Sequence, residues 1–352
     1  MKGYTTEKPV LQVKGLSTTF YTPAGEIGAV EKVSFSLRQN RCLALIGESG
    51  AGKSVTALSL LRMIPSPGRI KEGQILFNGS DLLSLPISKM REVRGDGISL
   101  MFQDSLTAFN PVLTIGAQIK ETVMTHRALG GREAEQVVKE KLASLKLPAG
   151  RVFGSYPFQL SGGMRQRAAL ALALVLHPNV LIADEPTSSL DVTLQEQILA
   201  ELEYQLEECC LSILFITHDL GAAAAIADEV AVMYSGHIME QGALKHVYEE
   251  PLHPYTRALL NAHPTYCRGG RLSSIPGNAA LASEKIKGCP FHPRCHFVEP
   301  LCCELMPQVA RLEGGREVAC HRVKGEVSWF EKGAVPDHFA GHGAHQILQY
   351  KA

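Results

Sequence analysis

Short apolar runs recur along the chain, and each one predicts a buried strand. Residues 43–46, 180–183 and 213–216 contain only apolar side chains, and the first run ends at a glycine. Such runs are typical of parallel strands that are covered on both faces of a sheet. Residues 54–63 have the apolar spacing of a helix, and helical stretches precede the later runs. This alternation predicts an α/β fold with a parallel sheet.

Two regions depart from the alternation and predict additional parts. Residues 74–77 lead into Asn78-Gly79 and indicate antiparallel strands joined by tight turns. Residues 114–147 have helical spacing and predict an inserted helical lobe. After Pro251, proline, glycine and cysteine become frequent and the periodicity fades. We expect an α/β domain at residues 10–250 with a helical subdomain at about 104–165, a small cysteine-rich C-terminal extension at 251–325 and a flexible tail at 326–352.

Composition narrows the class of protein. The length of 352 residues predicts two domains, or one large domain with an appended one, and the hydrophobic fraction of 45% is enough for a real core. The 35 basic and 35 acidic residues balance, so no basic excess suggests a nucleic-acid partner. Residues 1–9 contain no apolar run, and the most apolar window, 168–176, is too short to span a bilayer. We expect a cytosolic protein, whose nine cysteines are reduced or bound to metal.

One segment has every fixed position of a phosphate-binding loop. It separates the run at 43–46 from the helical pattern at 54–63, and it is Gly47-Glu48-Ser49-Gly50-Ala51-Gly52-Lys53-Ser54. Glycines let backbone N–H groups turn toward phosphate oxygens, and the helix start adds positive potential. Lys53 is expected to reach the outer phosphates and the Ser54 hydroxyl to hold Mg²⁺. A glycine turn with an exposed lysine is the alternative, which the strand–loop–helix order disfavours.

Acidic and imidazole groups follow two of the later strands. Asp184 and Glu185 come directly after the run at 180–183, at the strand end where parallel sheets bind ligands. Asp184 is expected to bind Mg²⁺, and Glu185 to polarise the attacking water. His218 is near the end of the run at 213–216 and is expected beside the γ-phosphate. Taken alone, an acidic loop or a structural histidine would explain these residues.

Residues 160–167 resemble the signature motif of ATP-binding-cassette (ABC) ATPases. Their sequence is Leu160-Ser161-Gly162-Gly163-Met164-Arg165-Gln166-Arg167. The resemblance implies a phosphate-loop ATPase fold in which Ser161, Gly162, Gly163 and Gln166 act on the nucleotide held by a facing subunit. Serine and the glycines open a helix, whose dipole favours a phosphate group. An N-capped surface helix would explain the serine but not the whole motif.

Other family elements occur in order over residues 10 to about 264. The resemblance implies that Gln103 is the Q-loop glutamine, which contacts Mg²⁺ and senses the membrane subunits. It also implies that Asp191 belongs to the D-loop (residues 189–191), that His218 is the switch histidine, and that Phe20 stacks on adenine. Tyr21 is the neighbouring candidate for the adenine contact, and a core aromatic is the alternative for Phe20.

Three short segments resemble the dipeptide, oligopeptide and nickel importer branch of this family. They are Tyr156-Pro157, Phe109-Asn110-Pro111 and His253-Pro254-Tyr255-Thr256. Phe158, where the branch often has histidine, and Ser188-Ser189, where it often has Thr-Ala, depart from the pattern without touching the chemistry. The resemblance implies an ATP-hydrolysing subunit that powers uptake of peptides or a related small solute. Nickel or metal-chelate uptake is the alternative, and an exporter has less support.

The extension contains a cysteine pattern similar to that of the same branch. Cys289, Cys295, Cys302 and Cys320 match four cysteines that can bind a [4Fe–4S] cluster, and Cys303 is an extra thiol. Four thiolates would also suit structural zinc, although most zinc sites use closer Cys-x-x-Cys pairs. Reduced cysteines without a ligand are the third interpretation. We expect metal binding because a loop-rich segment of this size usually needs a cross-link.

The resemblance implies a dimer of two ATPase subunits, identical or related, with two ATP molecules between them. ATP binding closes the interface, and hydrolysis reopens it. Two transmembrane permease subunits and an extracytoplasmic substrate-binding protein are the other implied partners, at the cytoplasmic face of the plasma (inner) membrane. A cassette ATPase acting on ribosomes or DNA repair would carry tandem cassettes or a long coiled coil. A structural metal protein would lack the nucleotide motifs.

Overall fold

The computed structural model describes residues 8–23, 25–104, 107–188, 190–263, 275–278 and 286–323. The chain forms two compact units. The first unit is made of residues 1–11, 37–41 and 76–216, and the second of residues 12–36, 42–75 and 217–352. The predicted tail at 326–352 and Ser189 of the predicted D-loop lie outside the described residues.

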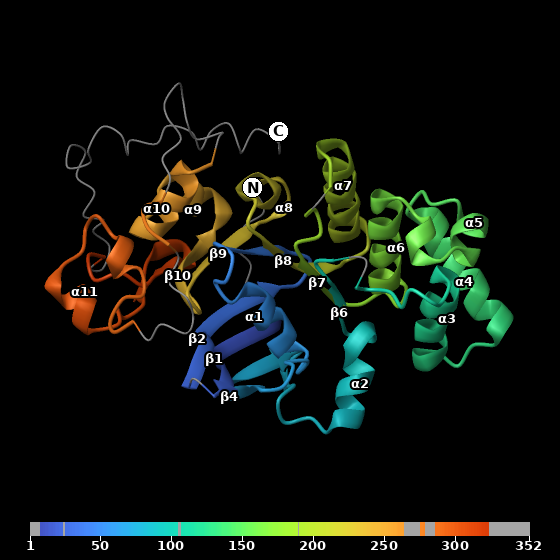
Figure 1. Cartoon of the computed structure of the whole chain (residues 1–352), viewed down its shortest axis with the longest axis horizontal. Helices are drawn as coiled ribbons and strands as arrows, with labels where there is room; N and C mark the ends of the chain where they lie inside the picture. The colour runs from blue at the N-terminus through green and yellow to red at the C-terminus, as the bar shows by residue number, and fades with distance from the viewer. Residues whose placement is uncertain are drawn as a thin grey trace. The chain divides into compact units, whose positions relative to one another are not determined.

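The first unit contains a parallel sheet and a lobe of helices (Figure 1). Strand β7 pairs in parallel with β6 and β8, so Val180 is in register with Ile98 and with Ser212. In the lobe, α3, α4 and α5 contact one another, and α6 packs on both the lobe and β6. The elements are β5 (Ser80–Asp81), α2 (Ile87–Asp96), β6 (Ile98–Met101), α3 (Ile115–His126), α4 (Gly131–Ser144), α5 (Ala149–Gly154), η1 (Pro157–Gln159), α6 (Gly162–Leu174), β7 (Val180–Asp184), α7 (Val192–Glu208) and β8 (Ser212–Thr217).

The helices of this unit have clear local causes. In α4, the buried residues Ala134, Val138 and Leu142 are spaced four apart and therefore share one face. Thr114 caps α3 by accepting a hydrogen bond from the Ala117 N–H at 3.3 Å. The most apolar window of the sequence, 168–176, falls mainly in α6, where most of its side chains are buried in the protein.

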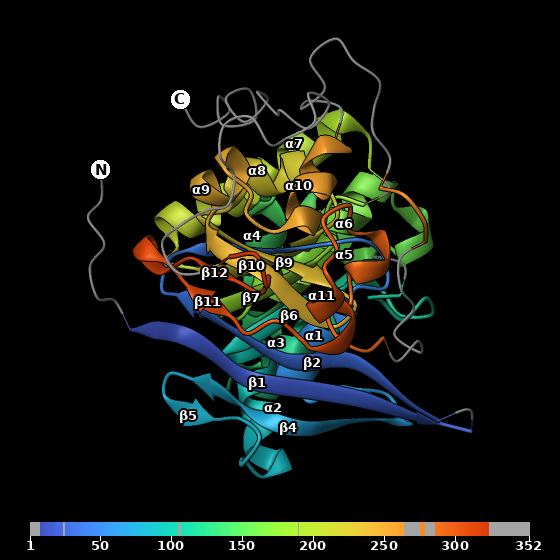
Figure 2. The same ribbon diagram turned by 90° about the vertical axis from the view of Figure 1, so that its left-hand side faces the viewer.

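The second unit is built on a mixed sheet in the order β11-β12-β10-β9-β3. Strands β3 and β9 are parallel, whereas β9, β10, β12 and β11 pair antiparallel. Figure 2 shows the short strands β11 and β12 beside β10. The elements are β3 (Cys42–Ile46), α1 (Lys53–Leu60), α8 (Leu220–Ile226), β9 (Glu229–Tyr234), β10 (His237–Ala243), α9 (Leu244–Glu249), α10 (Pro254–Asn261), η3 (His292–Arg294), α11 (Pro300–Glu304), β11 (Ala310–Arg311), η4 (Glu313–Gly315) and β12 (Glu317–Val318).

An antiparallel sheet completes the fold. Its strands follow the order β2-β1-β4, with bounds β1 (Pro9–Thr22), β2 (Gly25–Arg38) and β4 (Gly68–Phe77). The end of β4 pairs with β5 through Leu76 opposite Asp81. The predicted α/β fold, with its parallel sheet, antiparallel strands and helical lobe, is confirmed. Within the described ranges, no helix combines the length and the apolar character needed to cross a membrane.

Candidate functional site

The predicted phosphate loop connects β3 to α1 in the second unit, as the strand–loop–helix pattern requires. Gly47 has φ +156°, and a Cβ atom there would lie 2.1 Å from the Met233 carbonyl oxygen. Gly52 has φ +101°, and its Cβ would lie 2.3 Å from the Ala29 carbonyl oxygen. Both positions therefore require glycine, because any side chain would collide with backbone that cannot move aside.

Lys53 folds back over this loop. Its side chain is buried, with 5% exposure, and Nζ donates to the carbonyl oxygens of Gly47 and Glu48 at 2.8 and 3.0 Å. Ser54 follows in the first turn of α1, and no side chain caps the start of this helix. Ser49 and Gly50, at the crest of the loop, are exposed. Backbone N–H groups at such a helix start are suited to bind an anion.

Two residues that the sequence did not predict hold the same loop. Arg294 pairs with the Glu48 carboxylate, and the Tyr255 hydroxyl accepts a hydrogen bond from the Glu48 N–H at 3.0 Å. Tyr255 belongs to the importer-branch segment at 253–256, which was the one available hint. Nothing in the sequence relates Arg294 to Glu48, because 246 positions separate them.

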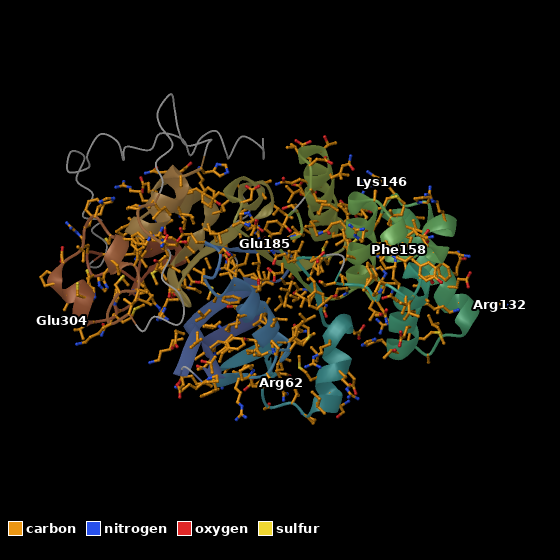
Figure 3. All side chains as sticks on the ribbon, in the orientation of Figure 1. Arg62, Arg132, Lys146, Phe158, Glu185 and Glu304 are labelled. Atoms are coloured by element: carbon orange, nitrogen blue, oxygen red, sulfur yellow. The ribbon has the colours of Figure 1, made fainter. Side chains whose placement is uncertain are left out.

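In the first unit, the structure brings Gln103 and Glu185 together. The Gln103 amide Nε2 donates to Glu185 Oε2 at 3.0 Å. Glu185, labelled in Figure 3, comes directly after β7 and has φ +47°, a left-handed conformation that costs a non-glycine residue free energy. Its N–H donates to the Ile216 carbonyl oxygen at 2.8 Å. Backbone strain of this kind is common at functional sites. Asp184, the last residue of β7, is buried.

The signature segment opens α6. The Ser161 hydroxyl caps the helix by accepting from the Met164 N–H at 3.3 Å, and Ser161 and Gly162 are exposed. A Cβ on Gly163 would lie 2.8 Å from the methyl groups of Leu194, so a larger residue here would need the Leu194 side chain to shift. Gln166 is buried and donates to the Pro186 carbonyl oxygen at 2.6 Å. The signature helix therefore contacts the segment that follows Glu185.

The remaining predicted site residues differ in how exposed they are and in what they contact. Asp191 caps α7 by accepting from the Leu194 N–H at 2.9 Å. His218 follows β8 directly and is exposed. Phe20 is half-buried on β1, where its ring lies against Gly68, whose Cβ would lie 2.7 Å from Cε1 of the ring. Tyr21 is 41% exposed. Both aromatic residues are therefore partly accessible to a ligand.

Comparison with known proteins decides the family. Residues 30–188 match the family model of ABC transporters, and residues 239–302 match the C-terminal region of oligopeptide/dipeptide transporters. A peptide import ATP-binding protein of Brucella abortus is 44% identical over 314 residues, which cover 89% of this chain and 94% of that protein. The chain belongs to the ABC transporter family. The oligopeptide transport ATP-binding protein OppD of Salmonella typhimurium is 42% identical over 316 residues, 89% of this chain and 93% of OppD.

Solved ABC structures have the same fold. The dimeric structure of MJ0796, a bacterial ABC transporter cassette, matches with a TM-score of 0.61 and 25% identity over 66% of this chain and 98% of that one. The cbiO1 structure from Clostridium perfringens, part of the ABC transporter complex cbiONQ, matches with a TM-score of 0.59 and 26% identity, over 69% and 92% of the two chains. The predicted resemblance and the predicted enzyme class, an ATP-hydrolysing ABC transporter subunit, are confirmed.

The extension of this ABC ATPase gathers four of its cysteines around one cavity. Cys289, Cys295, Cys302 and Cys320 all line this cavity in the second unit, whereas Cys303 is exposed and does not. Burial, aided by the neighbouring thiols, raises the pKa of Cys289 to about 12 and that of Cys295 to about 11. Thiols in such surroundings stay protonated near neutral pH unless a bound cation compensates the thiolate charge.

The cavity has further walls from the extension and from α10. Phe291, Phe297 and the buried His253 are among its lining residues. Burial lowers the pKa of His253 to about 3, so its ring is neutral, and its Nδ1 accepts from the Tyr255 N–H at 3.0 Å. Among the residues that the structure describes, no three His, Cys, Asp or Glu side chains are already grouped as ligands of a metal ion.

Proposed function

We propose that this ABC ATPase powers the import of di- or oligopeptides. The observation that carries the proposal is the combination of an ABC cassette with the C-terminal region of oligopeptide/dipeptide transporters. Relatives of 42–44% identity over nine-tenths of the chain are named for peptide import or oligopeptide transport. The experiment that tests this proposal measures uptake of labelled di- and tripeptides by cells that lack this chain. The wild-type chain should restore the uptake. Restored nickel uptake without peptide uptake would favour the metal-chelate alternative.

We also propose a role in the nucleotide chemistry for each residue that the motifs predict. The loop from Gly47 to Ser54 binds the phosphates, with Lys53 on the outer ones, and Ser54, Gln103 and Asp184 hold Mg²⁺. Glu185 polarises the attacking water, and His218 contacts the γ-phosphate. Support comes from the hydrogen bond between Gln103 and Glu185. It also comes from the location of the acidic and imidazole groups at the carboxyl ends of parallel strands: Asp184 ends β7, and Glu185 and His218 directly follow β7 and β8.

The chain is proposed to work as one of two ATPase subunits beneath two membrane permeases, at the cytoplasmic face of the plasma membrane, with an extracytoplasmic binding protein delivering cargo. The matched MJ0796 cassette is a dimer. In the dimer, Ser161, Gly162 and Gly163 of one subunit face the nucleotide of the other. Tyr156 and Phe158 offer a membrane subunit an apolar contact on the helical lobe. Their rings are stacked with centroids 5.6 Å apart, and Phe158, which is labelled in Figure 3, is 67% exposed.

Lys53→Met is expected to weaken Mg-ATP binding about tenfold or more. Methionine fills the buried site of the lysine stem but cannot donate to a phosphate, and a hydrogen bond to a charged group is worth about 1.5–3 kcal/mol. Calorimetric titration with Mg-ATP measures the dissociation constant. Lys71→Met is the matched control, because the Lys71 side chain is 56% exposed and pairs with Glu26. If the two variants bind Mg-ATP with equal affinity, Lys53 does not bind the phosphates.

We also propose that Cys289, Cys295, Cys302 and Cys320 hold a [4Fe–4S] cluster, with structural zinc as the alternative. The donor set fits, because the four thiols share one cavity and thiolates are the ligands that such clusters use. The bound group would cross-link a segment that has little regular structure: its helices and strands between residues 286 and 323 are two to five residues long.

Adjacent cysteines provide a sharp test of this assignment. Cys302 lines the cavity and Cys303 is exposed, so Cys302→Ser should lose the cluster while Cys303→Ser keeps it. Iron and acid-labile sulfide are measured on anaerobically purified protein, where the wild type should contain about four of each. Stoichiometric zinc in place of iron would support the alternative. Wild-type protein with neither metal, or equal loss in both variants, would contradict the proposal.

A further inference from the structure

Arg294 lies in the cysteine segment of the extension, directly before Cys295, yet its side chain is bonded to the phosphate loop. The side chain is 6% exposed, and Nη1 and Nη2 donate to the two carboxylate oxygens of Glu48 at 2.6 and 3.0 Å. Its Nε donates to the Pro276 carbonyl oxygen at 2.8 Å. A bidentate ion pair of this kind fixes both the position and the orientation of the carboxylate.

The backbone around Glu48 is held at the same time. The peptide group between Gly47 and Glu48 donates its N–H to the Tyr255 hydroxyl at 3.0 Å and accepts from Lys53 Nζ at 2.8 Å. The following carbonyl, that of Glu48, accepts from the same Nζ at 3.0 Å. The location of the Lys53 ammonium therefore depends on the two peptide groups that flank Glu48.

Tyr255 is itself fixed by buried aromatic packing. Its ring centroid lies 4.7 Å from that of Tyr234 and 5.3 Å from that of Phe291. Phe291 is fully buried, lines the cysteine cavity, and lies three residues before Arg294. The stretch between Cys289 and Cys295 thus reaches the phosphate loop by two routes: a charged one through Arg294 and an aromatic one through Phe291 and Tyr255.

We propose that Arg294 and Tyr255 are positioning residues for ATP, which hold Glu48, and through it Lys53, in the arrangement that binds the phosphates. The inference rests on the proposed nucleotide-binding role of the phosphate loop. Both residues act through Glu48 rather than on the nucleotide. Because Phe291 and Arg294 belong to the cysteine segment, ordered folding of that segment is required for full nucleotide affinity.

The test compares Arg294→Gln with Arg311→Gln in the full chain. Arg294→Gln should raise the dissociation constant of a non-hydrolysable Mg-ATP analogue, and the KM for ATP, about tenfold, with kcat within about twofold. Arg311→Gln should leave both unchanged, because the Arg311 side chain is 84% exposed in its pair with Glu317. Circular dichroism checks that each variant is folded. If Arg294→Gln fails to fold, Arg294→Lys replaces it: it keeps the charge without the fork, and about a threefold rise is expected.

A double-mutant cycle separates positioning from a general loss of stability. In a Glu48→Gln background, adding Arg294→Gln should change the dissociation constant less than about twofold, because the partner through which Arg294 acts is already altered. Additive effects, or wild-type affinity in Arg294→Gln, would overturn the inference. A wild-type chain that does not bind the Mg-ATP analogue would instead overturn the proposed function itself, so the two failures are distinguishable.

Discussion

Glu185→Gln is expected to hydrolyse ATP at least about a hundredfold more slowly than the wild type while it binds Mg-ATP with similar affinity. A positioned general base contributes about 10²- to 10⁴-fold to a rate, and an amide cannot accept the proton of the attacking water. Glutamine has nearly the same shape as glutamate, and the Glu185 backbone stays anchored by its N–H bond to Ile216. The loss should therefore appear in kcat and not in binding.

Steady-state ATPase kinetics and calorimetric Mg-ATP binding measure the two quantities on the same preparation. Glu203→Gln is the matched control, because the substitution makes the same change in charge at an exposed position on α7 of the same unit. Hydrolysis by Glu185→Gln at near wild-type rate would exclude Glu185 as the base. Gln103→Ala tests its neighbour separately: it removes the 3.0 Å hydrogen bond to Glu185 but leaves the carboxylate in place, so a smaller loss of kcat is expected.

The strands that the sequence predicted best are the fully buried ones. The runs at 43–46, 180–183 and 213–216 became β3, β7 and β8, whose residues are all buried. Strand β4 was predicted only at its end, because residues 68–74 are mostly polar and only partly buried or exposed. Strands β9 and β10 were not predicted, and β10 even buries a charged residue, Glu240, completely. Such a residue departs from the binary pattern on which strand prediction depends.

In the candidate site too, some features could be predicted from the sequence and others could not. Motifs of contiguous residues, such as the loop from Gly47 to Ser54, could be predicted because each position serves one local geometry. The hydrogen bond from Gln103 to Glu185 and the pair of Arg294 with Glu48 join residues that are 82 and 246 positions apart. No local rule relates such distant residues, so the tertiary fold alone reveals that the cysteine segment contacts the phosphate loop.

Glu240 connects the extension to β10, and breaking this connection is the second change for which we expect a large effect, here on stability. Glu240 is completely buried and pairs with the similarly buried Arg316, whose Nε donates to it at 3.1 Å. The same carboxylate accepts the N–H groups of Leu252 and His253 at 3.1 and 2.9 Å. Beside the pair, β12 joins β10, with Val318 opposite Glu240. One buried carboxylate therefore links three segments of the second unit.

Arg316→Met is expected to destabilise this part of the protein by about 3–5 kcal/mol, because it leaves the buried Glu240 carboxylate without its cation. Hydrogen exchange of the β10 and β12 amides, including that of Ala319, which donates to Met239, measures the local opening free energy. Protection should fall more than about a hundredfold, or to the limit set by the stability of the extension. Circular dichroism reports whether the rest of the chain remains folded.

Two further variants decide whether charge burial is the cause. Arg311→Met makes the same substitution at an exposed pair on the neighbouring strand and should cost less than about 1 kcal/mol. Adding Glu240→Gln to Arg316→Met should restore part of the protection, since an uncharged amide oxygen still accepts the Leu252 and His253 N–H groups while the isolated charge is gone. If the double variant is no more stable than Arg316→Met alone, the main cause of the destabilisation is instead lost side-chain packing around Gly242, which the Arg316 stem covers.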